Sequence, residues 1–251
     1  MLLRRITQHV KEQNWFAVCI DFLIVVVGIF VGLQVQEWNE NRKDRVEAEE
    51  YRQRLLADMQ LSVATNQDQI GQNRIQVEGM DLVLAALNQC ELPEEDESTF
   101  AGGLYNMGKI NMPAMVTGTL DELNATGRFP LVGDVDLRRT ITEATRRFET
   151  VDGIEGQVTS RMIPSISYVR ERIRFSINEH RFTGNPIAPT EVHYDFASIC
   201  TDPKFANAIA NVREMTLAII ALTEDIIEHQ TTVSGALKIA IKGAPQAGIS
   251  E

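Results

Sequence analysis

The sequence predicts an all-α protein, in which one N-terminal transmembrane helix continues into an antiparallel bundle of three to four helices with an irregular loop region. Three observations favour this fold class. An apolar stretch occupies residues 15–35, and two later segments carry hydrophobic side chains at heptad spacing. Only 6% of the chain is aromatic, whereas strong helix formers such as Ala, Leu and Glu are frequent.

The predicted transmembrane helix covers residues 15–36, and an amphipathic segment that lies on the membrane surface, residues 1–14, precedes it. Residues 15–35 number 21, and only Asp21 and Gln34 among them are strongly polar. At about 1.5 Å per residue, a helix of this length spans about 30 Å of hydrocarbon. The sequence therefore predicts one crossing of a lipid bilayer.

This crossing is predicted to be an uncleaved signal anchor. A short basic segment precedes it, as in a cleaved signal peptide, but the apolar run is longer than such a peptide contains. Gln34, Gln36 and Glu37 follow it in place of small residues that mark a cleavage site. We therefore expect a single-pass protein of the bacterial inner membrane.

Two features inside the span suggest contacts there. Gly28 and Gly32 form a GxxxG pattern, which allows two helix backbones to approach closely. The pattern is compatible with a homodimer, with contact to another membrane protein, and with incidental glycines. Asp21 is an ionisable residue near the start of the helix, where water and the helix dipole favour an anion. We expect it to set the depth of the helix or to contact a partner.

A soluble helical-bundle domain is predicted for residues 37–233. Residues 37–90 contain no proline and two glycines, so the membrane helix is expected to continue through them. Apolar side chains recur at heptad spacing from Leu56 to Leu87, and Asn66 and Asn73 occupy positions in this seam. We predict a buried polar seam in which the two asparagines fix the register of packing; contact with a ligand is the alternative.

The middle of the domain is expected to hold shorter helices. Pro93 and its acidic neighbours end the long helix, and residues 98–106 predict a short one. A capping box at residues 119–122 and a stop at Gly127 predict another. A further helix is expected to start near Asp134.

That further helix is predicted to be kinked or ended by Pro164 and to continue from 166 to 181. Residues 182–202 then form the longest loop, with a short strand possible in it. Asp202 and Pro203 predict the N-cap and first residue of a last helix, whose seam runs from Phe205 to Ile226. Residues 234–251 are predicted to be a flexible tail, because they are rich in small residues.

Charge and cysteine usage limit the environment of the domain. The chain carries a net charge of −11; residues 1–36 carry +1 and the rest carries −12, so nucleic acid is not expected as a partner. Cys90 and Cys200 either form a disulfide or remain two separate thiols. A disulfide would place the domain in an oxidising compartment, and we therefore expect a cytoplasmic N-terminus and a periplasmic domain. The basic residues on both sides of the span do not decide the orientation.

No catalytic, cofactor-binding or metal-binding motif is found. The sequence lacks HExxH, CxxC, Walker A and GxSxG patterns, and its four histidines have no metal-ligand spacing. His180 and His193 bracket part of the long loop, where a polar loop or a small metal site would account for them. We accordingly expect no catalytic residues and no cofactor.

Two local patterns resemble a known family. Asp21–Glu40 contains an acid, an apolar run with glycine, and then L-Q-x-x-x-W-N-E; Thr119–Val132 reads T-L-D-E-L-N-A-T-G-R-F-P-L-V before a helix that begins Leu137-Arg138. Both are similar to a family of bacterial single-pass membrane proteins that is grouped as a domain of unknown function. The family often has Glu at the position of Asp21 and Ser at that of Thr126. The resemblance implies a membrane anchor with a helical domain, and it implies no activity.

The predicted function is a protein-interaction, scaffold or accessory role in a membrane assembly, because two heptad seams and a GxxxG pattern are present without a catalytic constellation. The expected partners are the lipid bilayer and either a second copy of the chain or other membrane proteins. The alternative is a ligand-sensing or enzymatic extracytoplasmic domain that uses residues 98–130 and 182–202, where Pro, Gly and His collect.

Overall fold

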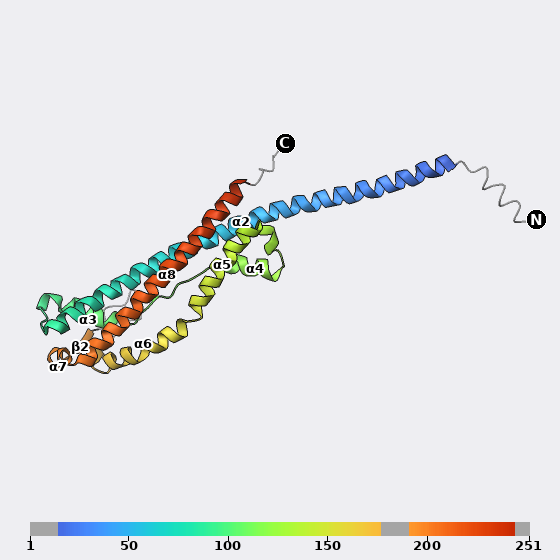
Figure 1. Ribbon diagram of the computed structural model, residues 1–251. Coiled ribbons are helices and arrows are strands. Elements are labelled where there is room, and N and C mark those ends of the chain that lie inside the picture. The colour runs from blue at the N-terminus through green and yellow to red at the C-terminus, as the bar shows by residue number, and fades with distance from the viewer. Residues whose placement is uncertain (1–14, 177–190, 244–251) are drawn as a thin grey trace, which may run out of the picture. The chain divides into compact units, whose positions relative to one another are not determined.

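The computed structural model describes residues 15–176 and 191–243, and it describes side chains from Cys19 onward except that of Asp21. The chain divides into two compact units, residues 1–50 and 51–251. In its described part the first unit is a stretch of helix α2, whose bounds are Trp15–Gln89 (Figure 1). The predicted amphipathic segment, residues 1–14, lies outside the described residues.

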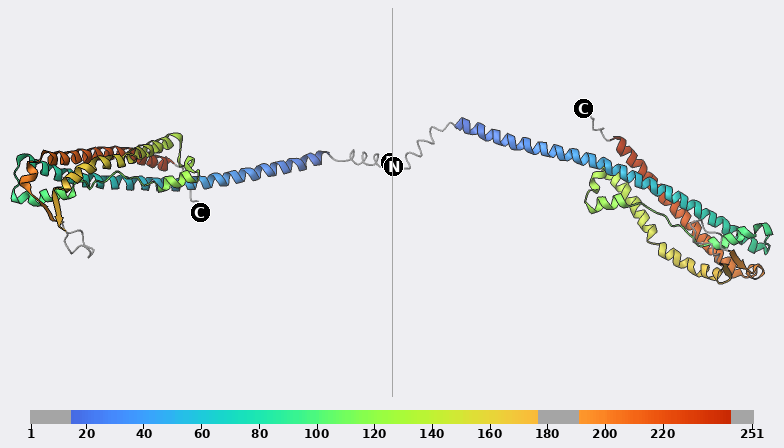
Figure 2. Two further views of the ribbon diagram at one scale, coloured as in Figure 1. Left: turned by 90° about the horizontal axis from the view of Figure 1, so that it is seen from below. Right: turned by 180° about the vertical axis from the view of Figure 1, so that it is seen from behind.

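The second unit contains three rods of helix that lie side by side lengthwise (Figures 1 and 2). The first rod is α2 from Tyr51 onward. The second is α5 (Val135–Asp152) followed by α6 (Glu155–Arg170), and the third is α8 (Pro203–Gly243). α8 runs antiparallel to the other two, as expected for the predicted antiparallel bundle.

Short elements lie at the two ends of these rods. At the end where α2 finishes are η1 (Glu94–Asp96), α3 (Glu97–Asn106), α7 (Phe196–Cys200) and the strands β1 (Ile173–Ser176) and β2 (Glu191–Tyr194). The strands pair antiparallel, with Ile173 opposite Tyr194. At the other end are α4 (Gly118–Ala125) and η2 (Phe129–Val132). Apart from this hairpin, the described elements are helical, so the fold is all-α.

Two hydrophobic clusters form the core of the second unit. The larger one joins α2 from Ile70 onward to α3, α6, α7 and the first half of α8, and it includes the fully buried Phe100 and Phe205. The other joins Tyr51 and its neighbours on α2 to α4, α5 and the end of α8. Every buried member of both clusters lies between residues 51 and 237. The second unit therefore has a core that needs no residue of the first.

Two helices begin where the sequence predicted, one near Asp134 and one after the predicted N-cap Asp202. Asp134 precedes α5, and its carboxylate accepts a hydrogen bond of 2.9 Å from the Leu137 N–H. Asp202 precedes α8, and its carboxylate accepts one of 3.0 Å from the Lys204 N–H. Each carboxylate satisfies a backbone donor that has no partner within its helix.

The end of α4 also agrees with the prediction, whereas its start does not. Gly127 has a φ of +69°, and the Arg128 N–H returns to the Leu123 carbonyl at 2.9 Å, which completes a glycine C-cap. The predicted capping box is wrong, because Thr119 lies inside α4 and is 4% exposed. Its N–H donates to the Asp58 carboxylate of α2 at 3.2 Å, so a side chain from another helix replaces the local cap.

The second rod breaks at Gly153, and Pro164 lies inside α6. Glycine loses more conformational freedom in a helix than any other residue, which favours a break there. The helix expected over 166–181 ends at Arg170. Ile173 and Phe175 alternate with exposed arginine and pair as strand β1, because β-branched and aromatic side chains fit a half-buried sheet.

The prediction of a flexible tail from residue 234 is wrong for residues 234–243. α8 continues to Gly243, and Leu237 is fully buried in the second cluster. Val233 and Leu237 extend the buried face of the seam, and their burial offsets the cost of about 1 kcal/mol of Gly235 in a helix. Residues 244–251 lie outside the described residues.

Candidate functional site

A continuous apolar segment of α2 lies in the first unit. Eleven large hydrophobic side chains between Ile20 and Val35 are 43–70% exposed. Soluble monomers rarely expose contiguous apolar surface on this scale. Among the described residues, two helices, α2 and α8, are long and apolar enough to cross a membrane, but none of the apolar window of α2 is buried, against 39% of that of α8.

The predicted contact residues of the span are on this segment. Gly28 and Gly32 lie one turn apart, and a Cβ added at either would meet no atom within 4 Å. Their face of the helix is therefore open. Asp21 lies within α2, but its side chain is outside the described residues.

In the second unit, Asn66 and Asn73 hold an extended segment, residues 109–117, which we name the strap. The Asn73 side chain accepts from the Asn111 N–H at 3.0 Å and donates to the Asn111 carbonyl at 2.8 Å. Asn66 forms the same pair with Ala114, at 2.7 and 2.9 Å. Both asparagines are 0% exposed. The predicted polar seam is thus buried, and its partner is the backbone of the chain itself.

The spacing of these pairs follows from helix and strand geometry. Asn66 and Asn73 are seven residues apart on α2, whereas Asn111 and Ala114 are three apart on the strap. Seven helical residues rise about 10.5 Å, and three extended residues about 10 Å. The strap can therefore run antiparallel to α2 and meet one asparagine per helical heptad.

Further side chains secure the strap, and the sequence analysis did not identify them. Ser62 accepts from the Val116 N–H at 2.8 Å. Gln230 of α8 donates to the Ala114 carbonyl at 3.1 Å and accepts from Asn66 at 3.0 Å, so α2, the strap and α8 meet there. Two features of the sequence could have identified them. Ser62 lies four residues before Asn66 on the same face of the helix, and Gln230 lies between apolar seam residues of α8.

Cys90 and Cys200 are joined in a disulfide, with 5.3 Å between their Cα atoms. Cys90 ends α2 with a φ of +51°, and Cys200 is the last residue of α7. The bond ties the end of the first rod to the start of the third across 110 residues of sequence. Cys19, the remaining cysteine, is a free thiol exposed on α2.

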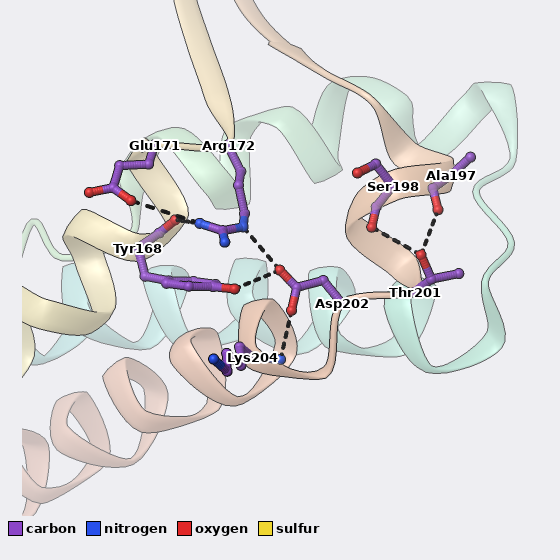
Figure 3. Close-up of polar contacts among 8 residues, drawn as sticks. All are labelled: Tyr168, Glu171, Arg172, Ala197, Ser198, Thr201, Asp202 and Lys204. Atoms are coloured by element: carbon purple, nitrogen blue, oxygen red, sulfur yellow. Dashed lines mark hydrogen bonds and ion pairs between the residues drawn. The ribbon is translucent and has the colours of Figure 1, made fainter.

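A polar cluster beside this disulfide fixes the start of α8 (Figure 3). The Tyr168 hydroxyl donates to the Asp202 carboxylate at 2.8 Å, and Arg172 donates to the same oxygen at 2.9 Å. The Arg172 guanidinium lies over the Tyr168 ring, 3.4 Å from its centre. Asp202 is therefore held by the end of α6 as well as by the backbone that it caps.

These contacts change two pKa values. The hydrogen bond from Tyr168 is the main cause that lowers the pKa of Asp202; burial opposes it, and the Lys204 N–H and Arg172 add to it. The pKa of Tyr168 is raised, first by burial and then by its hydrogen bond to Asp202. Asp202 caps α8, and Tyr168 and Arg172 both donate to Asp202, so these contacts support a structural role for the cluster.

The two loop regions of the alternative hypothesis meet through aromatic side chains. Phe100 packs against Tyr194 and Phe196, with ring centres 5.0 and 5.6 Å apart. The Tyr194 hydroxyl is buried and has no hydrogen-bond partner among the described residues. Burial is the main cause that raises its pKa.

The histidines do not assemble a metal site in the part of the chain that the structure describes. No group of three His, Cys, Asp or Glu side chains there is arranged to hold an ion. The Nε2 of His193 lies 3.9 Å from the Glu191 carboxylate, and the His193 side chain is 46% exposed. His180 lies outside the described residues.

No protein-family model matches the chain, and no curated protein or solved structure is significantly similar to it.

Proposed function

We propose that this chain is a single-pass protein of the bacterial inner membrane, with a periplasmic helical domain that acts by protein contact as a scaffold or accessory subunit. The observation that carries the anchor is the exposed apolar segment between Ile20 and Val35. A helix with this surface is stable where lipid covers it. α8 passes the same test of length and composition, but its apolar face belongs to the core of the second unit.

The disulfide supports the periplasmic side. Structural disulfides form and persist in oxidising compartments and are rare in the bacterial cytosol. A domain with a disulfide between Cys90 and Cys200 is therefore suited to the periplasm. A single crossing then leaves the short N-terminus in the cytoplasm.

A reporter fusion tests the orientation. Alkaline phosphatase, which is active only outside the cytosol, is fused after Glu251, and a matched fusion carries the chain without residues 1–36. We expect activity in the first fusion and none in the second. Activity of a cytosolic fluorescent reporter at the same position, with an inactive phosphatase, would reverse the orientation.

Protein contact through the span is tested by crosslinking in membranes. The open face at Gly28 and Gly32 lets a second helix approach closely. We expect Gly28→Leu with Gly32→Leu to abolish a crosslinked dimer, and the control Val27→Leu with Val31→Leu to retain it. A chain that remains monomeric and recovers no partner in native membranes argues against a scaffold.

Ligand sensing is the second candidate, favoured by the buried and unpartnered Tyr194 hydroxyl where the two loop regions meet. Melting temperatures measured across a panel of metabolites and metals test it. A flat response across the panel removes this candidate.

A further inference from the structure

An apolar cleft of about 190 Å³ opens between α6, the strap and α8 in the second unit. Its apolar lining consists of Ile110, Met112, Val158, Met162, Ile166 and Ile219. The floor is buried, since Met162 is 4% and Ile219 is 1% exposed. Water in such a space has few polar partners, so displacing it by an apolar group is favourable.

The cleft lies beside α6, a helix that buries few of its residues. Of its 16 residues only Met162 and Val169 are buried, whereas α8 buries thirteen of 41. Gly108, which directly precedes the strap, has a φ of +83°, and a Cβ there would meet the Ile166 side chain at 2.6 Å. The chain thus touches α6 at Gly108, and the cleft lies next to this contact, beside Val158 and Met162.

The polar side chains of the lining are Glu155 and Thr159, both exposed. Glu155 is in the first turn of α6, where the helix dipole favours its charge. No cation pairs with its carboxylate among the described residues. The cleft therefore combines an apolar floor with an unneutralised carboxylate at its rim.

We propose that this cleft binds a small amphipathic cation, with a body the size of one aromatic ring and an ammonium head that pairs with Glu155. The size follows from the volume, because a dry cavity of about 150 Å³ holds a benzene molecule. The sign of the head follows from the carboxylate. The site lies wholly within the second unit and is independent of the membrane orientation and of contacts in the span.

Methyl NMR of the full chain in nanodiscs, labelled at the methionine methyls, tests this site. Three probes share one ring and differ in the head: 2-phenylethylamine, 2-phenylethanol and 3-phenylpropionate. We expect saturable shifts of the Met112 and Met162 methyls and none of Met59, which lies in the other cluster. The amine should bind about threefold more tightly than the alcohol, as expected for an exposed ion pair, and the carboxylate least tightly.

Variants separate the two parts of the site. Val158→Phe fills the cleft, so it should abolish the shifts with all three probes; Thr159→Phe, from the exposed rim, does the same if Val158→Phe does not fold. Glu155→Gln should remove the preference for the amine, whereas Glu149→Gln, an equal change of charge outside the cleft, should retain it. Absence of saturable shifts at Met112 and Met162, equal shifts at Met59, or a preference that survives Glu155→Gln would overturn the proposal.

Discussion

Two side-chain amides of α2 make the hydrogen bonds that a neighbouring strand would otherwise supply to the strap. The Ala114 N–H and carbonyl are both satisfied by Asn66, and Gln230 adds a second donor to the carbonyl. A buried backbone group that loses its partner costs its full desolvation penalty. The asparagines therefore specify where the strap lies as well as adding stability.

Replacing Asn66 with Ala tests this role. The change leaves the half-buried Ala114 N–H without its acceptor, so we expect a loss of about 2–4 kcal/mol in the free energy of unfolding, measured by urea denaturation in detergent. Asn211→Ala is the matched control, because that exposed asparagine of α8 bonds only to the Ser165 hydroxyl among its described contacts. Its effect should stay within about 0.5 kcal/mol. Equal losses in the two variants would contradict the role given to Asn66.

Two adjacent glycines of α3 should respond in opposite directions to alanine. A Cβ on Gly103 would lie 2.6 Å from the Gly79 carbonyl oxygen of α2, whereas one on Gly102 would meet nothing within 4 Å. We expect Gly103→Ala to destabilise by about 1–3 kcal/mol, because α3 must move away from α2. Gly102→Ala should stabilise by about 0.5–1 kcal/mol through helix propensity. Thermal melts of both variants check the pair, and a shared sign would refute the close contact.

The Asp202 cluster makes a prediction for acid pH. Because the pKa of Asp202 is lower in the folded than in the unfolded chain, its contribution to stability is complete above about pH 4 and is lost as the pH falls through the folded pKa. Tyr168→Phe removes the hydrogen bond that is the main cause of the lowered pKa of Asp202. The difference in unfolding free energy between wild type and this variant should therefore shrink below about pH 4.

Urea denaturation between about pH 2.5 and pH 7 measures that difference. Tyr194→Phe is the control, because the Tyr194 hydroxyl has no hydrogen-bond partner among the described residues. Its difference from wild type should not change over the acid range. A constant difference for Tyr168→Phe as well would show that Tyr168 does not act through Asp202.

At the scale of elements, the disulfide connects the end of α2 to the end of α7, although the two cysteines are 110 residues apart in the sequence. In the chain-entropy model, closing a loop of 110 residues stabilises by about 4–5 kcal/mol. We expect the double variant Cys90→Ser with Cys200→Ser to melt lower than wild type and to ignore added reductant. Cys19→Ser, which removes the free thiol, should melt like wild type and stay sensitive to reductant. Free Cys90 and Cys200 thiols in mass spectra without reductant would remove the bond and the compartment inferred from it.

Periodicity and capping predicted the elements whose determinants are local. The long helix through Asn66, the N-caps Asp134 and Asp202, and the stop at Gly127 depend on residues within one or two turns. Their hydrogen bonds close within the same helix or its first turn. These positions could therefore be predicted without knowledge of the tertiary fold.

The sequence predictions were wrong where a residue far away in the sequence determines the local structure. Thr119 does not cap its own helix, because its N–H donates to Asp58, which lies 61 residues away in the sequence. Leu237 is buried in the second cluster, although its neighbours in the sequence are small. Ile173 leaves the helix because it pairs with Tyr194. For the candidate sites, the seam predicted that Asn66 and Asn73 are buried, but nothing in it identified the strap as their partner. The cleft depends on the gap between α6 and the strap, which periodicity does not describe.

At the scale of the molecule, the second unit should be independent of the first. Both clusters use only residues from 51 onward. We expect the chain without residues 1–36, exported to the periplasm by a foreign signal, to be soluble without detergent. Its melting temperature should lie within about 3 °C of that of the full chain, equivalent to about 1 kcal/mol.

A slightly longer deletion provides the control. Removing residues 1–55 also removes Tyr51 and Leu55, which are 6% and 1% exposed in the second cluster. This should cost about 2–5 kcal/mol, as for truncation of large core side chains. If the shorter deletion is as unstable as the longer one, the first unit contributes to the fold of the second.

The pairing of α2 with the strap has a consequence for how the chain can change its length. One residue inserted between Asn66 and Asn73 would turn the second asparagine by about 100° and remove it from the strap. A whole heptad inserted in α2 restores the direction of the side chain, but it needs about three more residues in the strap to reach the next amide. An insertion or deletion of seven residues in α2 therefore requires one of about three residues in the strap. Relatives without obvious sequence similarity can be recognised by such paired gaps in an alignment.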